Sequence, residues 1–234
     1  MNNIVSVWVK IWLYVVALVG IIHVVILLTN WDQYDWITRS IFLTIIITAA
    51  HVWEEQRYPG GFPFFFNTLL KSKTPLWYPM NEFLDSMTVS GVLLAFIGFL
   101  VFGEGQAWMG VSLIIFCFVE LFAHTLGGYI IFKKFKHKGK RTIYSPGHAT
   151  TVFGFVPIAI GVLYYLIENG LSTGSNWLYG FGAMFLILAI CIGVFEKLFE
   201  SKTSPYVFSK NYGIGYFRKF LTPAELTAAI NGAE

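Results

Sequence analysis

Charged residues are scarce in this sequence. Asp, Glu, Lys and Arg make up 12% of its 234 residues, whereas soluble domains carry roughly 25%. Hydrophobic residues make up 56%, and the mean hydropathy is +0.64. This composition excludes an ordinary soluble domain and predicts an integral membrane protein.

Cysteine is nearly absent as well. The two cysteines, Cys117 and Cys191, both lie inside apolar runs, where a free cysteine packs as a small hydrophobic side chain. We therefore expect neither a disulfide nor a cysteine metal site. The sequence also lacks an internal repeat, a coiled-coil heptad and a nucleotide-binding glycine motif, and we expect no nucleic-acid partner.

Long apolar runs are what the sequence does contain. Six of them approach about 20 residues, the length that a helix needs to cross roughly 30 Å of hydrocarbon. The predicted spans are Val7–Leu28, Trp36–Arg57, Phe83–Phe102, Gln106–Ile131, His148–Ile167 and Trp177–Phe199. The predicted fold class is an all-α polytopic membrane helix bundle, with a six-helix transmembrane domain over residues 1–202. Residues 203–234 are expected to form a cytoplasmic or interfacial tail, with a short helix that begins at the capping box Thr222-Pro223-Ala224-Glu225.

The distribution of basic residues orients these spans. Residues 133–141, between spans four and five, include six Lys or Arg residues and no acid. The connections at 29–35, 103–105 and 168–176 contain acids and no Lys or Arg. Because Lys and Arg are retained on the cytoplasmic side, both termini are predicted to be cytoplasmic. We expect a multi-pass protein of the cell's inner (plasma) membrane.

Ionisable residues inside the spans converge on the cytoplasmic side of this topology. The pentad His51-Val52-Trp53-Glu54-Glu55 ends span two, and Glu120 and His124 lie in the cytoplasmic half of span four. Spacings of three or four residues place the members of each set on one helix face. Such groups are costly in a membrane unless they are paired, bound to metal or beside a polar cavity, so they indicate a functional site.

These residue types predict a metal centre. Imidazole and carboxylate groups from two facing helices suit zinc, iron or manganese, and we expect a divalent metal, with zinc favoured. The candidate ligands are His51, Glu54, Glu120 and His124, of which both histidines and one glutamate complete a three-ligand catalytic site. Glu55 is the expected general base on metal-bound water. The candidates for the surrounding layer are Glu82, Asp85, Tyr144 and His148. A purely structural contact between helices, made of His–Glu hydrogen bonds, is the alternative.

The same residues carry a resemblance to a known family. His51-Val52-Trp53-Glu54-Glu55, a later histidine and Tyr144-Ser145-Pro146-Gly147 together resemble the HXXEE family of bacterial membrane proteins, which is described by an HXXEE motif, a further histidine and a YXPG motif. The resemblance implies that the further histidine is His124 or His148, and the neighbouring Glu120 favours His124. The family's function is unassigned, so the resemblance supplies no substrate.

Several functions fit these observations. We favour a metal-dependent hydrolase that acts at the cytoplasmic leaflet on a lipid-like or membrane-embedded substrate. A di-iron oxidase is the second hypothesis, because Glu54, Glu55, Glu82 and Glu120 include enough carboxylates to bridge two metals. The third is a metal-free protease, since Glu54-Glu55 resembles the paired glutamates of the CAAX-prenyl protease family, although Pro59 stands where that family has arginine. The non-enzymatic alternative is a transporter or sensor that binds cations or protons. The scarcity of polar residues in the outer halves of the spans favours an enzyme.

The predicted orientation can be tested by cysteine labelling. In a cysteine-free background, we expect Lys138→Cys to resist a membrane-impermeant maleimide in intact cells and to react after permeabilisation, because residues 133–141 are predicted to be cytoplasmic. Ser172→Cys, in an acidic connection on the opposite side, is the control and should react in intact cells. Labelling of position 138 from outside would contradict the orientation.

Overall fold

The computed structural model describes residues 3–103 and 105–231, and the regular elements in that part of the chain are all helices. Six helical segments are long and apolar enough to cross a membrane, which confirms the predicted all-α bundle. The first four are α1 (Asn3–Thr29), α2 (Trp36–Gln56), α4 (Glu82–Phe102) and α5 (Ala107–Phe135). The fifth joins α6 (His148–Thr150), the π-helix η3 (Thr151–Phe155) and α7 (Val156–Glu168). The sixth joins α8 (Gly174–Leu188), the π-helix η4 (Ala189–Val194) and α9 (Phe195–Phe199).

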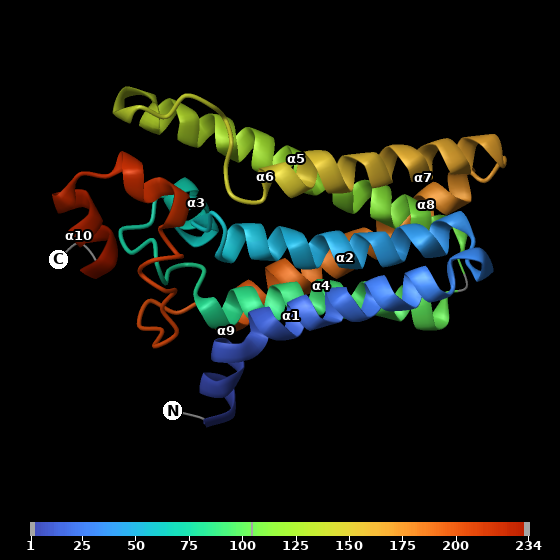
Figure 1. The fold of residues 1–234 in the computed structure, drawn as a ribbon, viewed down its shortest axis with the longest axis horizontal. Coiled ribbons are helices and arrows are strands. Elements are labelled where there is room, and N and C mark those ends of the chain that lie inside the picture. The colour runs from blue at the N-terminus through green and yellow to red at the C-terminus, as the bar shows by residue number, and fades with distance from the viewer. Residues whose placement is uncertain (1–2, 104, 232–234) are drawn as a thin grey trace.

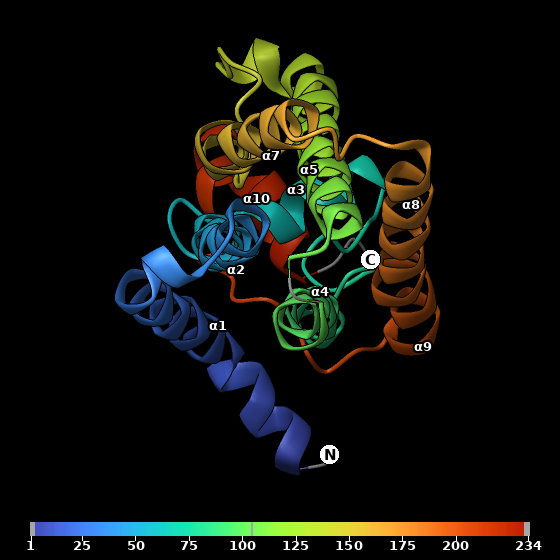
Figure 2. The ribbon, with the colours of Figure 1, turned by 90° about the vertical axis from the view of Figure 1, so that its right-hand side faces the viewer.

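α2 is the central helix of the bundle. In Figure 1 the spans lie side by side, with both termini at the same end of the molecule. Figure 2, viewed along the bundle, shows α2 among α1, α4, α5 and α7. In the most apolar stretch of each span, 56% of the stretch is buried inside the protein in α2 but only 17% in the sixth span. The sixth span therefore lies at the outside of the bundle, whereas α2 is covered by protein on most of its surface.

The sequence sets both ends of α2. Asp35 caps the first turn, because its Oδ1 accepts a hydrogen bond from the backbone N–H of Thr38 at 2.7 Å. Beyond the last turn, Gly61 has a φ of +105°, and a Cβ there would lie 2.7 Å from the carbonyl oxygen of Ile214. Glycine is needed at this position, which caps the start of the next helix just past the pentad at 51–55.

A cap covers that end of the bundle. It consists of residues 58–80, which include α3 (Phe62–Leu69), and residues 204–231, which include η5 (Gly215–Phe220) and α10 (Pro223–Asn231). Backbone hydrogen bonds join the two segments, from Phe208 N to Leu76 O at 3.0 Å and from Tyr216 N to Gly60 O at 3.1 Å. The buried apolar residues shared by the cap and the end of α5 are Phe64, Phe65, Leu76, Ile131, Phe135, Ile214, Phe217, Phe220 and Ala229. Figure 1 places this cap next to the last turn of α2.

One lysine is buried inside the cap. Lys140 is 2% exposed, and its Nζ donates hydrogen bonds to the Tyr144 carbonyl oxygen and the Tyr216 hydroxyl. The same Nζ lies 4.7 Å from the centre of the Tyr216 ring, a cation–π contact. Burial, and to a smaller extent repulsion from Lys219, lowers the pKa of Lys140 to about 8. Lys140 thereby ties the tail to the loop that contains Tyr144.

Candidate metal centre

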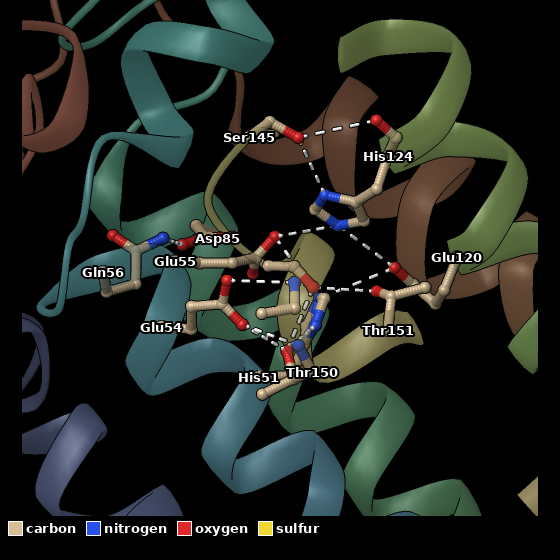
Figure 3. Close-up of polar contacts among 12 residues, drawn as sticks. His51, Glu54, Glu55, Gln56, Asp85, Glu120, His124, Ser145, Thr150 and Thr151 are labelled. Atoms are coloured by element: carbon tan, nitrogen blue, oxygen red, sulfur yellow. Dashed lines mark hydrogen bonds and ion pairs between the residues drawn. The ribbon is translucent and has the colours of Figure 1, made fainter. Parts of the chain in front are cut away.

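Two buried histidines face each other across the interface between α2 and α5. The rings of His51 and His124 lie edge to face, with 5.0 Å between their centroids. The Nε2 atoms of both histidines are 3.4 Å from Oε1 of Glu55. Oε2 of Glu120 lies 3.6 Å from His51 Nε2 and 3.5 Å from His124 Nε2. The four side chains form a closed arrangement, the His–Glu ring (Figure 3).

The helix directions explain this ring. Spans two and four run the same way through the bundle (Figure 1). On α2 the histidine precedes the glutamate by four residues, and on α5 the glutamate precedes the histidine by four. One helical turn therefore separates the members of each pair, and each histidine lies opposite a glutamate of the other helix.

The distances in the ring suit a metal ion better than direct hydrogen bonds. A charge-assisted N–H···O bond is about 2.7–2.9 Å long, whereas the four contacts measure 3.4–3.6 Å. Ligand atoms placed tetrahedrally about 2.0–2.2 Å from a zinc ion lie about 3.3–3.6 Å apart. His51, Glu120 and His124 each offer one ligand atom within 4.8 Å of the others. This group can hold a metal ion.

Thr150, at the end of α6, fixes the tautomer of His51. Its hydroxyl lies 2.7 Å from Glu54 Oε2 and 3.0 Å from the Gly147 carbonyl oxygen. Both partners only accept, so the single hydroxyl hydrogen goes to one of them. The Thr150 oxygen, 2.9 Å from His51 Nδ1, must then accept the Nδ1–H of His51. Nε2 then faces Glu55 and Glu120 of the ring, and it can bind a metal ion when it carries no proton.

Glu54 points away from the ring toward the start of the fifth span. Its Oε1 accepts hydrogen bonds from the Tyr144 hydroxyl at 2.9 Å and the Ala149 N–H at 3.2 Å. Its Oε2 accepts from the N–H and the hydroxyl of Thr150, at 2.9 and 2.7 Å. Burial, and next the charge of Glu54, raises the pKa of Tyr144, so the phenol remains a donor. Glu54 thus clamps α6 to the end of α2.

Gly147 of the Tyr144–Gly147 turn lies against both histidines. Its φ is +92°, and a Cβ there would lie 2.4 Å from His124 Cε1 and 2.8 Å from His51 Cε1. A side chain at this position would therefore displace both imidazole rings. The Phe65 ring of α3 is stacked with the His124 ring, with an interplanar angle of 3° and a centroid distance of 6.2 Å. The turn and the cap together confine His124.

The remaining predicted residues lie around the ring. Asp85 is buried, and its Oδ2 accepts a hydrogen bond from Gln56 Nε2 at 2.7 Å. Glu82 lies in the first turn of α4. His148 is half-buried at the start of α6. His124 and His148 are the two candidates for the further histidine of the family. Of these, His124 has a ligand atom within 4.8 Å of those of His51 and Glu120.

Sequence reasoning did not identify Thr150 or Phe65. Thr150 is a hydroxyl residue just after the YXPG turn, at the start of an apolar span. This position is the feature of the sequence that indicates a role for it beside the turn. Phe65 is one of a run of phenylalanines in the 58–80 connection, which carries no sign of which ring would meet a histidine.

A cavity of about 170 Å³ adjoins the ring between α2, α4, α5 and the sixth span. His51, Glu55 and Glu120 lie in its wall, together with Asp85 and Thr88 of α4. Most of the other lining residues are apolar. The ring therefore has one face against a mostly apolar space inside the bundle.

The fold and this site define a class: a polytopic helical membrane protein with a buried histidine–glutamate cluster that can hold a metal ion near one end of the bundle. Residues 42–162 match the family described as "Protein of unknown function with HXXEE motif", and the chain belongs to that family. The match includes the His–Glu ring and the Tyr144–Gly147 turn. Comparison with curated proteins gives no match, and comparison with solved structures gives none either.

Two glycine substitutions separate backbone strain from the contact with the histidines. Gly147 and Gly139 have φ values of +92° and +91°, but nothing lies within 4 Å of a Cβ built at Gly139. Both alanine variants should lose roughly 1–2 kcal/mol through strain. We expect Gly147→Ala to melt at least about 4 °C below Gly139→Ala in detergent, because only Gly147 abuts the imidazole rings. Equal melting temperatures would show that position 147 does not confine the histidines.

Proposed function

We propose that this protein is a metal-dependent hydrolase of the membrane, in which His51, His124 and Glu120 hold Zn²⁺ and Glu55 is the general base. The observation that carries the proposal is the group of His51, Glu120 and His124, whose ligand atoms lie within 4.8 Å of one another, with Glu55 Oε1 3.4 Å from both histidines. Three protein ligands and one open position make a catalytic zinc site. Glu54, with both oxygens bound to the α6 region, is assigned to positioning and not to the metal.

The chemistry follows from these assignments. A zinc ion held by these ligands would lower the pKa of a bound water to about 7 and so would supply a nucleophile at neutral pH. Glu55 is 5% exposed and lies in the cavity wall, and its Oε1 is 3.4 Å from the Nε2 atoms of both histidines, so it would be the group that accepts the proton of that water. Because the cavity is inside the bundle, the substrate is membrane-embedded. By the predicted orientation, the reaction takes place at the cytoplasmic leaflet.

The geometry supports a single metal better than a di-iron centre. Two bridged metals need several free carboxylates around the histidines. Glu54 is engaged by four hydrogen bonds, and Glu82 lies outside the group with ligand distances. Glu55 and Glu120 remain, which is enough for one metal and one base.

The feature that most resembles a transport path is a row of buried hydroxyl side chains on α2. Ser40, Thr44 and Thr48 lead along the helix toward His51 and are each less than 5% exposed. Each hydroxyl donates to the backbone carbonyl four residues earlier, at 2.7–2.8 Å. Their donors are satisfied within α2 without any ion, so the row is explained by helix structure and supports the enzyme over a transporter.

Metal content is the first test of the proposal. Protein purified without a histidine tag and supplied with Zn²⁺ should contain about one zinc per chain by mass spectrometry. His51→Ala, His124→Ala and Glu120→Ala should each lose it, because each removes a ligand. His23→Ala is the matched control, since His23 is a buried histidine of α1 whose Nδ1 is 2.7 Å from the Val19 carbonyl oxygen. Wild-type protein that binds no zinc would contradict the proposal.

The two adjacent glutamates give a second test. Glu54 accepts from four donors, so the amide NH₂ of Glu54→Gln would face a donor. We expect this variant to lose about 1.5–3 kcal/mol of stability. Glu55→Gln should keep its melting temperature and its metal but lose roughly 10²–10⁴-fold in hydrolysis.

Cobalt supplies a readout of Glu55 that needs no substrate. With Co²⁺ in place of zinc, the visible spectrum follows ionisation of the bound water. Removing the neighbouring negative charge should lower the pKa of that water in Glu55→Gln, because Glu55 disfavours hydroxide. Loss of metal in a folded Glu54→Gln protein, with Glu55→Gln unchanged in metal and spectrum, would make Glu54 a ligand and would contradict Glu55 as the base. Two variants that match wild type in every respect would support the purely structural reading.

A further inference from the structure

The cavity beside the His–Glu ring has a long apolar wall. Its apolar lining includes Val89 and Val92 of α4, Phe116 of α5, and Leu188 and Ile192 of the sixth span. Its volume of about 170 Å³ is several times what one water molecule needs. A polar head and the first few carbons of a chain fill such a space, and a longer chain must leave it.

The sixth span provides the side where a chain can leave. Near α8 this span is fastened to α5, because Ser112 Oγ donates to the Gly180 carbonyl oxygen at 3.1 Å. Near η4 it is fastened to α4, because Thr88 Oγ1 donates to the Cys191 carbonyl oxygen at 2.9 Å. Figure 2 shows this change of neighbour, with α8 beside α5 and α9 beside α4.

The interval between α5 and η4–α9 is a part of the wall that no polar contact among the described residues ties together. In the described part of the chain, no hydrogen bond or ring contact joins α5 to η4 or α9. Ile192 lines the cavity and is 44% exposed, on the span that lies at the outside of the bundle. A chain that leaves the cavity past Ile192 enters the hydrocarbon of the bilayer.

The charges of the cavity select the head group. Its ionisable lining residues are His51 and four acids, Glu55, Asp85, Glu120 and Glu196, and no Lys or Arg stands among the described residues that line it. Even with a divalent cation in the His–Glu ring, the acids of the lining outnumber the cation. A carboxylate or phosphate head would meet like charge at close range, which is costly.

From this geometry we infer that the cavity binds a single-chain amphiphile with an uncharged or positively charged head, which enters from the bilayer between α5 and η4–α9. The head lies against the His–Glu ring, and the chain passes Val92 and Ile192 into the lipid. This inference deepens the proposed function by naming its substrate class. Occupation of the cavity does not itself require the metal, so the two can fail separately.

Matched photoreactive probes test the head-group selectivity. The protein in phosphatidylcholine nanodiscs is labelled with a diazirine-bearing alkyl amine at neutral pH, and labelled peptides are mapped by mass spectrometry. We expect labels on α4 and on the segment from α8 to α9. Dodecylamine should compete at least tenfold more strongly than laurate, which has the same chain length and the opposite charge. Equal competition by the two would overturn the inference.

Variants of the wall test the location. Val89→Trp should reduce labelling at least tenfold, because the indole fills the cavity. Leu94→Trp, on the same helix but 67% exposed and outside the cavity lining, should label like wild type. Ile192→Trp should block the opening, and it replaces Val89→Trp in the test if that variant does not fold. Unchanged labelling in a folded Val89→Trp or Ile192→Trp protein would refute the site. Zinc content, measured in parallel, should stay at the wild-type level in all three variants. If the wild-type protein is labelled as expected but holds no zinc, the proposed function is contradicted and the binding site is not.

Discussion

The placement of four ionisable side chains in one membrane bundle, with His51, Glu55 and His124 buried and Glu120 partly buried, is the constraint on which the rest of this structure depends. Each of them is costly in the hydrocarbon region when it stands alone, and the His–Glu ring keeps all four in mutual contact. Spans two and four run in the same direction and carry His and Glu in opposite order, so each histidine lies beside a glutamate of the other helix. The loss of any member leaves a buried charge or lone pair without its partner, so the ring acts as a unit.

The YXPG turn supports this ring without belonging to it. Gly147 leaves room for both imidazoles, and Thr150, three residues later, orients His51 through its Nδ1. Tyr144 and Thr150 also hold Glu54. Adjacent residues of a helix point about 100° apart, so Glu54 reaches the turn while Glu55 reaches the histidines. The two sequence motifs are thus one physical assembly, in which the second glutamate belongs to the ring and the first joins the ring to its support.

The sequence carried enough information for the spans and for the pairing of two helices, but not for the rotation of α2. Apolar run lengths predict the six spans, and four-residue spacing predicts which residues share a face. Buried residues occur all round α2, including the consecutive Ser40, Ile41 and Phe42, so no apolar stripe marks its inner side. The choice between Glu54 and Glu55 therefore depended on contacts with α6. The joining of the tail to the 58–80 connection likewise depends on segments far apart in the chain, which no local pattern predicts.

The surroundings of the ring bear on how reactants arrive. At the end with both termini, Phe62 and Phe66 of α3 line the cavity and Phe65 covers His124, so an aromatic layer separates the ring from that side. On the lateral side, the wall is formed by the exposed sixth span. Charges interact more strongly where bulk water is kept away, which favours a metal and a base over a solvated site. Hydrolysis consumes one water per turnover, and a cation can hold that water. For the hydrolysis proposed above, a site with aromatic side chains toward one end of the bundle and the exposed sixth span at its flank suits a substrate that the bilayer delivers.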